Sequence, residues 1–286
     1  MSSYRMEASR AVDKLVVVSR AMTEAAEAAV HLADADVPVL VDGEPGAGKK
    51  LLARVLHEEG RRGSGPLVTL RCEALTVAAL DRTLFGDEPS GAKGKFEEAS
   101  DGTLLLLNLE ELNPVAQERL LQVLEEGHYQ TAAHVTRPLT CRMVCTGNTT
   151  VLRDEVRVGR FSADLFRRLS AQTLRMPSLA ERRDDIPHLV VDILHEFASR
   201  ERVEPPIVPY HYMELLMNVS WQENVRQLRN HVESVMALSE GIFDPEIIRE
   251  HFTPVGAPST IKGAFETLLG RLRSQAPKPA TVTTRR

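Results

Sequence analysis

Short apolar runs alternate with helical patterns through the first 176 residues of the chain. Such runs are typical of parallel strands that are covered on both faces. The predicted strands are residues 37–41, 67–70, 103–107 and 142–146. The predicted helices are residues 12–32, with a short apolar stretch at 15–18, then 49–59 and 114–126. Because strands and helices alternate, we predict an α/β domain in which helices sandwich a doubly wound parallel sheet.

The pattern changes after Met176-Pro177, where only helical periodicity remains. These helical patterns predict a small all-helical domain over residues 177–251. Its predicted helices are residues 186–200, 210–218, 224–239 and 245–251. Residues 252–286 form a basic tail, in which 263–274 could make one amphipathic helix and 275–286 has a disordered composition.

Composition changes this picture little, and it excludes several classes of protein. The formal net charge is −5, with 43% hydrophobic residues and 26% charged residues, which is ordinary for a globular protein. An acidic whole argues against general nucleic-acid binding. The three cysteines contain no Cys-x-x-Cys pair, which argues against a zinc site. No apolar run is long enough to span a membrane and the first residues lack an apolar signal core, so we expect a cytoplasmic protein.

A glycine-rich loop lies between the first predicted strand and the helix that follows it. Glycines in such a loop let consecutive backbone N–H groups point at phosphate oxygens, and the helix presents its positive end to the same anion. A lysine at the end of the loop reaches the β- and γ-phosphates. A glycine-rich surface turn is the alternative, but the strand–loop–helix order favours phosphate binding. The predicted cradle is Gly43, Glu44, Pro45, Gly46, Ala47, Gly48, Lys49 and Lys50.

The last residue of this loop departs from the G-x-x-x-x-G-K-[ST] pattern. The usual serine or threonine contacts magnesium through its hydroxyl, and here that position is Lys50. The substitution removes an oxygen ligand and adds a charge that repels the metal. We therefore expect ATP or ADP as the ligand, with magnesium binding weakened.

Several further motifs, in order, resemble the AAA+ domain of the sigma-54-dependent activator family. They span about residues 15–250, and an ordered set is far more specific than a single phosphate loop. The motifs are Leu-Phe-Gly (84–86), Gly-Lys-Phe-Glu-Glu-Ala (94–99), Asp-Gly-Thr-Leu (101–104), Gly-Arg-Phe (159–161), Asp-Leu (164–165), Arg-Arg-Leu (167–169), Glu-Arg-Arg-Asp-Asp-Ile-Pro (181–187), Trp221 and Asn-Val-Arg-Gln-Leu (224–228).

The resemblance implies a ring-forming ATPase, usually hexameric, that remodels RNA polymerase carrying sigma-54. It also implies roles for three residues. Asn148 falls at the sensor I position, Arg168 at the arginine finger that acts on a neighbouring subunit, and Arg226 at sensor II in the helical lid. Guanidinium groups can stabilise the charge that spreads over a phosphoryl group during transfer. Spacing alone would favour solvated surface arginines at both positions.

The chain departs from the family where the catalytic acids belong. The strand at residues 103–107 should end in Asp-Glu, and the aligned residues are Leu107 and Asn108. A leucine cannot ligate magnesium, and an asparagine cannot accept a proton. Glu110 and Glu111 follow closely and could substitute if the strand were shifted. We expect them instead to be solvated carboxylates at a helix start, where acids are favoured.

Other departures affect the subunit boundary and the output. Arg71 replaces the asparagine that restrains the catalytic glutamate in the family, and Ser162 replaces one of two boundary arginines. The family's Gly-Ala-Phe-Thr-Gly-Ala loop, which contacts sigma-54, is reduced to residues 87–95, of which only Gly91-Ala92 match. After His251 there is room for one helix, so no dedicated DNA-binding domain is expected.

These observations predict an ATP-binding AAA+ protein with impaired hydrolysis and impaired sigma-54 contact, with Asn108 as a degenerate catalytic position. Its partner would be itself or a related AAA+ subunit in a ring, with the transcription machinery as a further possible partner. One alternative is an active ATPase with relocated carboxylates Glu110 or Glu111. Another is a nucleotide-independent interaction scaffold.

Overall fold

The computed structural model describes residues 15–87, 90–205 and 207–238. The chain divides into two compact units, one ending at Arg182 and the other beginning at Arg183. The predicted boundary lies slightly earlier, at Met176-Pro177. Three expectations fall outside the described residues: the helices at 245–251 and 263–274, and the disordered segment at 275–286.

A five-stranded parallel sheet forms the centre of the first unit, with the strand order β2-β5-β8-β1-β9. The strands are β1 (Val39–Asp42), β2 (Leu67–Arg71), β5 (Thr103–Leu107), β8 (Arg142–Gly147) and β9 (Gln172–Arg175). Four of them confirm predicted strands within a few residues. The sequence did not predict β9, because it is an edge strand in which only Leu174 is buried. A single buried position leaves no apolar run to find.

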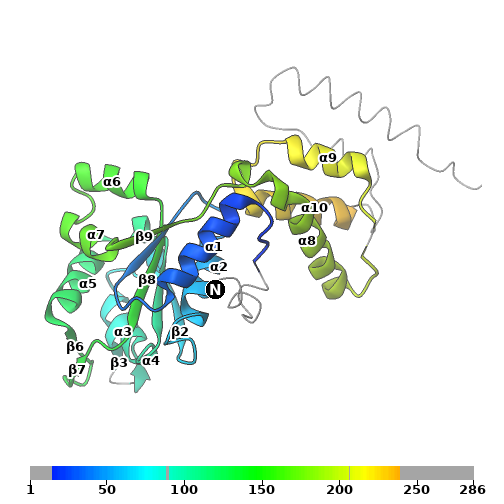
Figure 1. Cartoon of the computed structure of the whole chain (residues 1–286). Coiled ribbons are helices and arrows are strands. Elements are labelled where there is room, and N and C mark those ends of the chain that lie inside the picture. Colours follow the sequence, from blue (N-terminus) through cyan, green and yellow to red (C-terminus); the bar gives the residue numbers. More distant parts are fainter. Residues whose placement is uncertain (1–14, 88–89, 206, 239–286) are drawn as a thin grey trace, which may run out of the picture. The chain divides into compact units, whose positions relative to one another are not determined.

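Helices cover both faces of this sheet (Figure 1). In β5, Leu104 and Leu106 join one apolar layer, while Leu105 and Leu107 join the other. This division follows from the alternation of side chains along a strand. The layer around Leu105 contains α1 (Arg20–Ala33) and α2 (Lys49–Glu58), and the opposite layer contains α5 (Pro114–Glu126) and α7 (Ala163–Leu169). The predicted sandwich is therefore confirmed.

The first helix begins later than the pattern suggested. Leu15–Val18 is not helical, and Ser19 accepts a hydrogen bond at 3.2 Å from the backbone N–H of Met22. A serine in this position is a favoured N-cap, which fixes the start of α1 at Arg20. The apolar stretch before it contributes Leu15 to the core instead of a helical face.

Short elements complete the first unit. They comprise two helices before β5, two antiparallel ribbons and one helix after β8. Their bounds are α3 (Leu80–Phe85), α4 (Lys95–Glu98), β3 (Gly86–Asp87) with β4 (Ala92–Lys93), β6 (His128–Gln130) with β7 (Thr136–Pro138), and α6 (Thr149–Arg157). Single 3₁₀ turns lie at Cys72–Ala74, Leu109–Glu111 (η4) and Leu179–Glu181.

The described part of the second unit contains helices and no strand, as predicted. A 3₁₀ turn at Arg183–Asp185 leads into α8 (Ile186–Glu201), followed by α9 (Tyr210–Asn218) and α10 (Asn224–Leu238). Helix α8 contacts both of the others. The indole N–H of Trp221 donates to the carbonyl of Leu216 at 2.9 Å, which ties the loop before α10 to α9. None of the described helices has the length and the apolar character that crossing a membrane requires.

The core around β5 gives a direct test of this packing. Leu105 is fully buried between α2 and the neighbouring strands, so Leu105→Ala should leave a cavity and lower the free energy of unfolding by about 2–5 kcal/mol. Denaturant unfolding measures this loss. Val77→Ala removes a side chain that is 64% exposed and should change the stability little. Equal effects of the two substitutions would contradict the packing.

Candidate nucleotide site

The phosphate loop lies between the carboxyl end of β1 and the first turn of α2. Gly46 and Gly48 have φ angles of 74° and 109°, which a residue with a Cβ atom rarely adopts. Gly48 is the N-cap of α2, and no side chain caps the helix there. Because the first N–H groups of a helix have no partner within the helix, this end of α2 is available to an anion.

Lys49 folds back over its own loop. Its Nζ atom donates to the carbonyl oxygens of Gly43 at 2.6 Å and Glu44 at 3.0 Å. These contacts hold the ammonium group at the mouth of the loop, where terminal phosphates bind in a phosphate loop of this sequence. Arg182 supports the loop from behind: its side chain is 3% exposed and donates to the carbonyl of Ala47.

The sequence did not single out Arg182. It stands next to Arg183, which is exposed, in a run of charged residues in which the two arginines cannot be told apart by pattern. Its position at the end of the α/β unit does not distinguish a buried arginine from a solvated one. The guanidinium group of Arg182 also lies 3.3 Å from the sulfur atom of Met22 on α1. It therefore connects the loop to the first helix.

The end of β5 carries no acid. Leu107 is 8% exposed and belongs to the apolar layer beneath α1 and α2. Asn108 follows with a left-handed φ of 57°, which asparagine tolerates better than most residues. Its backbone N–H donates at 3.2 Å to the hydroxyl of Thr146, which is buried on β8. The chain thus turns away from the sheet at the position where the family has its catalytic glutamate.

The position of Glu110 shows that one expectation was wrong, namely that Glu110 and Glu111 are both solvated. Glu111 is exposed, as predicted, but Glu110 is half-buried and turns toward the end of β8. A Cβ atom placed on Gly147 would lie 3.0 Å from Glu110 Oε2. That oxygen is buried and has no hydrogen-bond partner among the described residues. The reason is the left-handed turn at Asn108, which redirects η4 so that one of its two acids faces inward.

Burial raises the pKa of Glu110, while the charge of Lys49 and the N–H of Asn148 act in the opposite direction. A carboxyl whose pKa is higher in the folded than in the unfolded state destabilises the fold once it ionises. That destabilisation is present above the folded-state pKa. It disappears below the unfolded-state value of about 4.3, where both states are protonated.

Glu110→Gln should therefore raise the melting temperature at neutral pH and leave it unchanged well below pH 4. The neutral amide has nearly the same shape but no ionic desolvation penalty. Thermal unfolding at the two pH values measures the difference. Glu111→Gln removes an exposed carboxylate of the same turn and is the matched control. An equal shift at both pH values would contradict the buried position of Glu110.

Asn148 is the N-cap of α6. Its side-chain oxygen accepts from the backbone N–H groups of Thr150 at 3.0 Å and Val151 at 3.2 Å. Next to it, the carboxylate of Asp42 accepts from the N–H of Thr149 at 2.8 Å. The carboxyl ends of β1 and β8 are therefore joined beside the phosphate loop. A sensor role for Asn148 stays a prediction.

The arginines implied by resemblance are both on the surface. Arg168, in the last turn of α7, forms an ion pair at 3.1 Å with Glu125 of α5, and its side chain is 41% exposed. Ser162, at the position of the missing boundary arginine, is instead the N-cap of α7. Arg226 belongs to the second unit, where it lies 4.0 Å from Glu223 and is 61% exposed. Their nucleotide roles remain predictions.

This site offers few ligands for a magnesium ion. Mg²⁺ prefers oxygen ligands in octahedral geometry, supplied by one or two carboxylates, a hydroxyl and waters. The two protein ligands of a standard phosphate-loop site correspond to Lys50 and Leu107, and neither offers an oxygen from its side chain. Among the described residues, no group of three or more histidine, cysteine, aspartate or glutamate side chains is placed to hold a metal ion. The residues present do not fit the metal that the fold implies.

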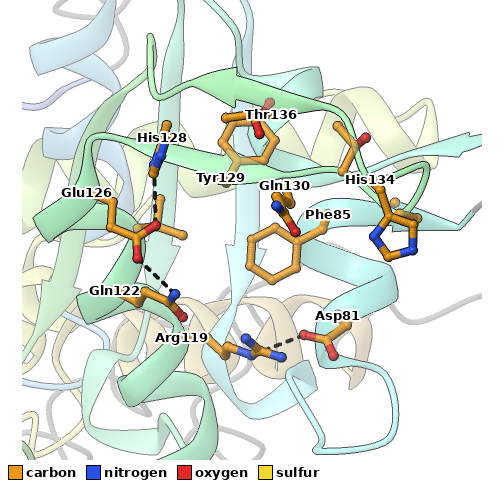
Figure 2. A pocket seen from close by; sticks show the side chains of 14 residues that line it. Asp81, Phe85, Arg119, Gln122, Glu126, His128, Tyr129, Gln130, His134 and Thr136 are labelled. Atoms are coloured by element: carbon orange, nitrogen blue, oxygen red, sulfur yellow. Dashed lines mark hydrogen bonds and ion pairs between the residues drawn. The ribbon is translucent and has the colours of Figure 1, made fainter.

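A separate cavity of about 500 Å³ lies between α3, α5 and the β6–β7 ribbon (Figure 2). Two pairs of ionisable side chains line it: Arg119 lies 3.5 Å from Asp81, and His128 lies 3.3 Å from Glu126. The ring of Phe85 lies between these pairs in Figure 2. None of its lining residues belongs to the phosphate loop, so the cavity is distinct from the nucleotide site.

The fold and the loop together define a P-loop core of the AAA+ type, followed by a helical unit. The family model of the sigma-54 interaction domain matches residues 15–175, and that of the AAA+ ATPase lid domain matches residues 180–259. The chain therefore belongs to the sigma-54 activator family.

Transcriptional regulators of similar sequence agree with this assignment. The transcriptional regulatory protein ZraR of Salmonella typhimurium is 36% identical over 261 residues, which cover 88% of this chain and 58% of that protein. The C4-dicarboxylate transport regulatory protein DctD of Rhizobium meliloti is 37% identical over 268 residues, 84% of this chain and 57% of that protein. This chain thus spans somewhat more than half of the length of these relatives.

Solved structures show the same fold. NtrX from Brucella abortus, crystallised with ADP, has a TM-score of 0.77 and 26% identity, covering 96% of this chain and 65% of NtrX. The same protein crystallised with ATP has a TM-score of 0.75 and 28% identity, covering 95% of this chain and 62% of NtrX.

Proposed function

We propose that this chain binds ATP in the phosphate loop and works as a hydrolysis-impaired regulatory subunit of an AAA+ assembly in transcription regulation. One contrast carries the proposal. The loop keeps its glycines and Lys49 in a conformation open to an anion, while the adjacent strand end carries Leu107 and Asn108. The crystal structures of NtrX with ADP and ATP support a nucleotide in this fold.

Hydrolysis depends on parts that this site lacks. Phosphoryl transfer requires a metal ion, an oriented water and cationic stabilisation acting together. Leu107 and Lys50 weaken the metal site, and Asn108 cannot accept a proton from water. Ser162 removes one cation at the subunit boundary. Since binding needs only the loop and its lysine, binding can persist where catalysis has been lost.

A second function rests on Glu110. This chain would be an active ATPase if the inward-facing carboxylate of Glu110 oriented the attacking water in place of Asn108. The half-buried position and the nearby charge of Lys49 favour this alternative over one based on Glu111, which is exposed. An interaction scaffold that binds no nucleotide has less support, because Arg182 and Lys49 both hold the phosphate loop in a shape suited to phosphate.

Contact with sigma-54 would also be impaired. Strand β3 pairs with β4 so tightly that Asp87 faces Ala92, which leaves only residues 88–91 between them. These four residues are Glu-Pro-Ser-Gly, so the sequence between the two strands contains no large apolar side chain. We therefore propose that the chain acts beside another AAA+ subunit and does not open promoter complexes alone.

The partner in this proposal is a second copy or a related AAA+ subunit. Arg168 would leave Glu125 and reach a phosphate bound to its neighbour, so ATP should shift the chain toward larger assemblies. Analytical sedimentation with and without ATP measures this shift. Arg168→Ala should abolish the response, whereas Arg167→Ala, which removes an adjacent arginine paired with Asp164, should not. A monomer at every concentration and nucleotide state would count against the assembly.

The function as a whole is tested by calorimetric titration with ATP alongside a phosphate-release assay on the same preparation. Binding without turnover is the expected result. Binding with turnover that needs Glu110 would select the active ATPase, and no binding would leave only the scaffold.

A further inference from the structure

We infer that this site takes ATP without magnesium, and that Lys50 supplies the positive charge that the metal supplies in other phosphate loops. The inference rests on the proposed function, because it concerns the same site and the same nucleotide. It concerns the ionic form of the ligand, which is metal-free nucleoside triphosphate.

The two departures that carry this inference fall on the same ion. In a standard P-loop site the magnesium ion is held by the hydroxyl after the lysine and by the aspartate of the Walker B strand. Here those positions are Lys50 and Leu107. One exchange removes an oxygen and adds a positive charge, and the other replaces a carboxylate with a buried apolar side chain.

Lys50 is placed to act on phosphate. It is the second residue of α2, one position after Lys49, and its side chain is exposed. It makes no hydrogen bond or ion pair with the residues that the structure describes, so no carboxylate neutralises it. A lysine is longer than the serine or threonine of a standard loop, so its ammonium group can reach a phosphate oxygen directly, without a metal ion between them. The positive end of α2 adds to the same field.

The remaining carboxylates do not rebuild the metal site. One oxygen of Asp42 already accepts the N–H of Thr149 at 2.8 Å. Glu110 Oε2 is buried beside Gly147 at the end of β8, where the protein leaves it little open space for a metal ion. A magnesium ion held by Glu110 alone would also lie near the charge of Lys49, which opposes it.

The charges at the loop instead match a more negative ligand. Metal-free ATP carries the full charge of its phosphates, whereas magnesium neutralises part of it. Lys49 and Lys50 together present two ammonium groups at the start of α2, where a standard loop presents one. Charge-assisted hydrogen bonds from both would compensate for the missing ion.

The experiment is calorimetric titration of the full chain with ATP, once in excess EDTA and once in excess Mg²⁺. The wild-type chain should bind at least as tightly in EDTA as in Mg²⁺. Lys50→Thr should weaken binding in EDTA by about tenfold or more, as expected for one charge-assisted contact. Lys50→Thr combined with Leu107→Asp should make binding depend on Mg²⁺. Lys93→Thr, the same substitution on β4, is the control for net charge and should change nothing.

Three outcomes would overturn the inference while leaving ATP binding intact. They are wild-type binding only in Mg²⁺, an unchanged affinity of Lys50→Thr in EDTA, and Mg²⁺-dependent binding that is lost in Glu110→Gln. The last would show that Glu110 holds the metal. Absence of binding in both conditions would instead overturn the proposed function itself. Circular dichroism of each variant separates a loss of contact from a loss of fold.

Discussion

Replacing Lys49 with alanine is expected to weaken ATP binding by roughly ten- to a hundredfold, the value of one charge-assisted hydrogen bond to an ionised group. The Nζ atom of Lys49 lies at the mouth of the loop, held by the carbonyls of Gly43 and Glu44. On binding, it would exchange these neutral acceptors for phosphate oxygens, which are stronger partners. The N–H groups of the loop would remain, but the terminal phosphates would lose their nearest cation.

Titration of the wild type and of Lys49→Ala with ATP measures this loss. Lys93→Ala removes a lysine from β4, away from the loop, and should bind as the wild type does. Equal affinities of wild type and Lys49→Ala would exclude the loop as the nucleotide site.

ATP turnover is expected to be far below about 1 s⁻¹, the low end for typical enzymes. General-base assistance alone is worth about 10²–10⁴ in rate, and Asn108 cannot provide it. Leu107 adds the loss of a metal ligand. Leu107→Asp together with Asn108→Glu should therefore raise phosphate release, although Lys50 and Ser162 should keep the gain partial. Steady-state phosphate release in Mg²⁺ is the measurement.

Glu110 provides the internal control for this prediction. If the chain hydrolyses ATP at about 1 s⁻¹, the catalytic carboxylate has been relocated, and the conclusion that the end of β5 no longer supports catalysis is wrong. In that case Glu110→Gln should abolish turnover, whereas Glu111→Gln alters an exposed acid and should leave turnover unchanged. If turnover is negligible, both substitutions should leave it unchanged.

The parts of the fold with strong local signals could be predicted from the sequence. The central strands are rich in apolar residues, and α2 follows a glycine-rich loop whose glycine spacing indicates phosphate binding. Strand β9 could not be predicted, because an edge strand with one buried residue has no apolar run. The start of α1 was misplaced because an apolar stretch before Ser19 packs into the core without being helical.

The candidate site could be predicted only where one residue type decides the chemistry. Gly48 and Lys49 belong to that class, and so does the loss of acids at Leu107 and Asn108. The orientation of Glu110 could not be foreseen, because it depends on the left-handed turn at Asn108. Arg182 was missed for a similar reason: its burial depends on tertiary packing against Ala47, which no local pattern records.

The nucleotide recovered from the protein after mixing with ATP tests the central claim most directly. Excess chain is incubated with a smaller amount of labelled ATP, one sample in Mg²⁺ and one in EDTA, and the protein-bound nucleotide is then separated and identified over time. The account predicts that the bound nucleotide stays ATP in both samples, and that Lys49→Ala retains much less of it. Bound nucleotide that converts to ADP would contradict the loss of hydrolysis, and a wild-type protein that carries no nucleotide in either sample would contradict the site.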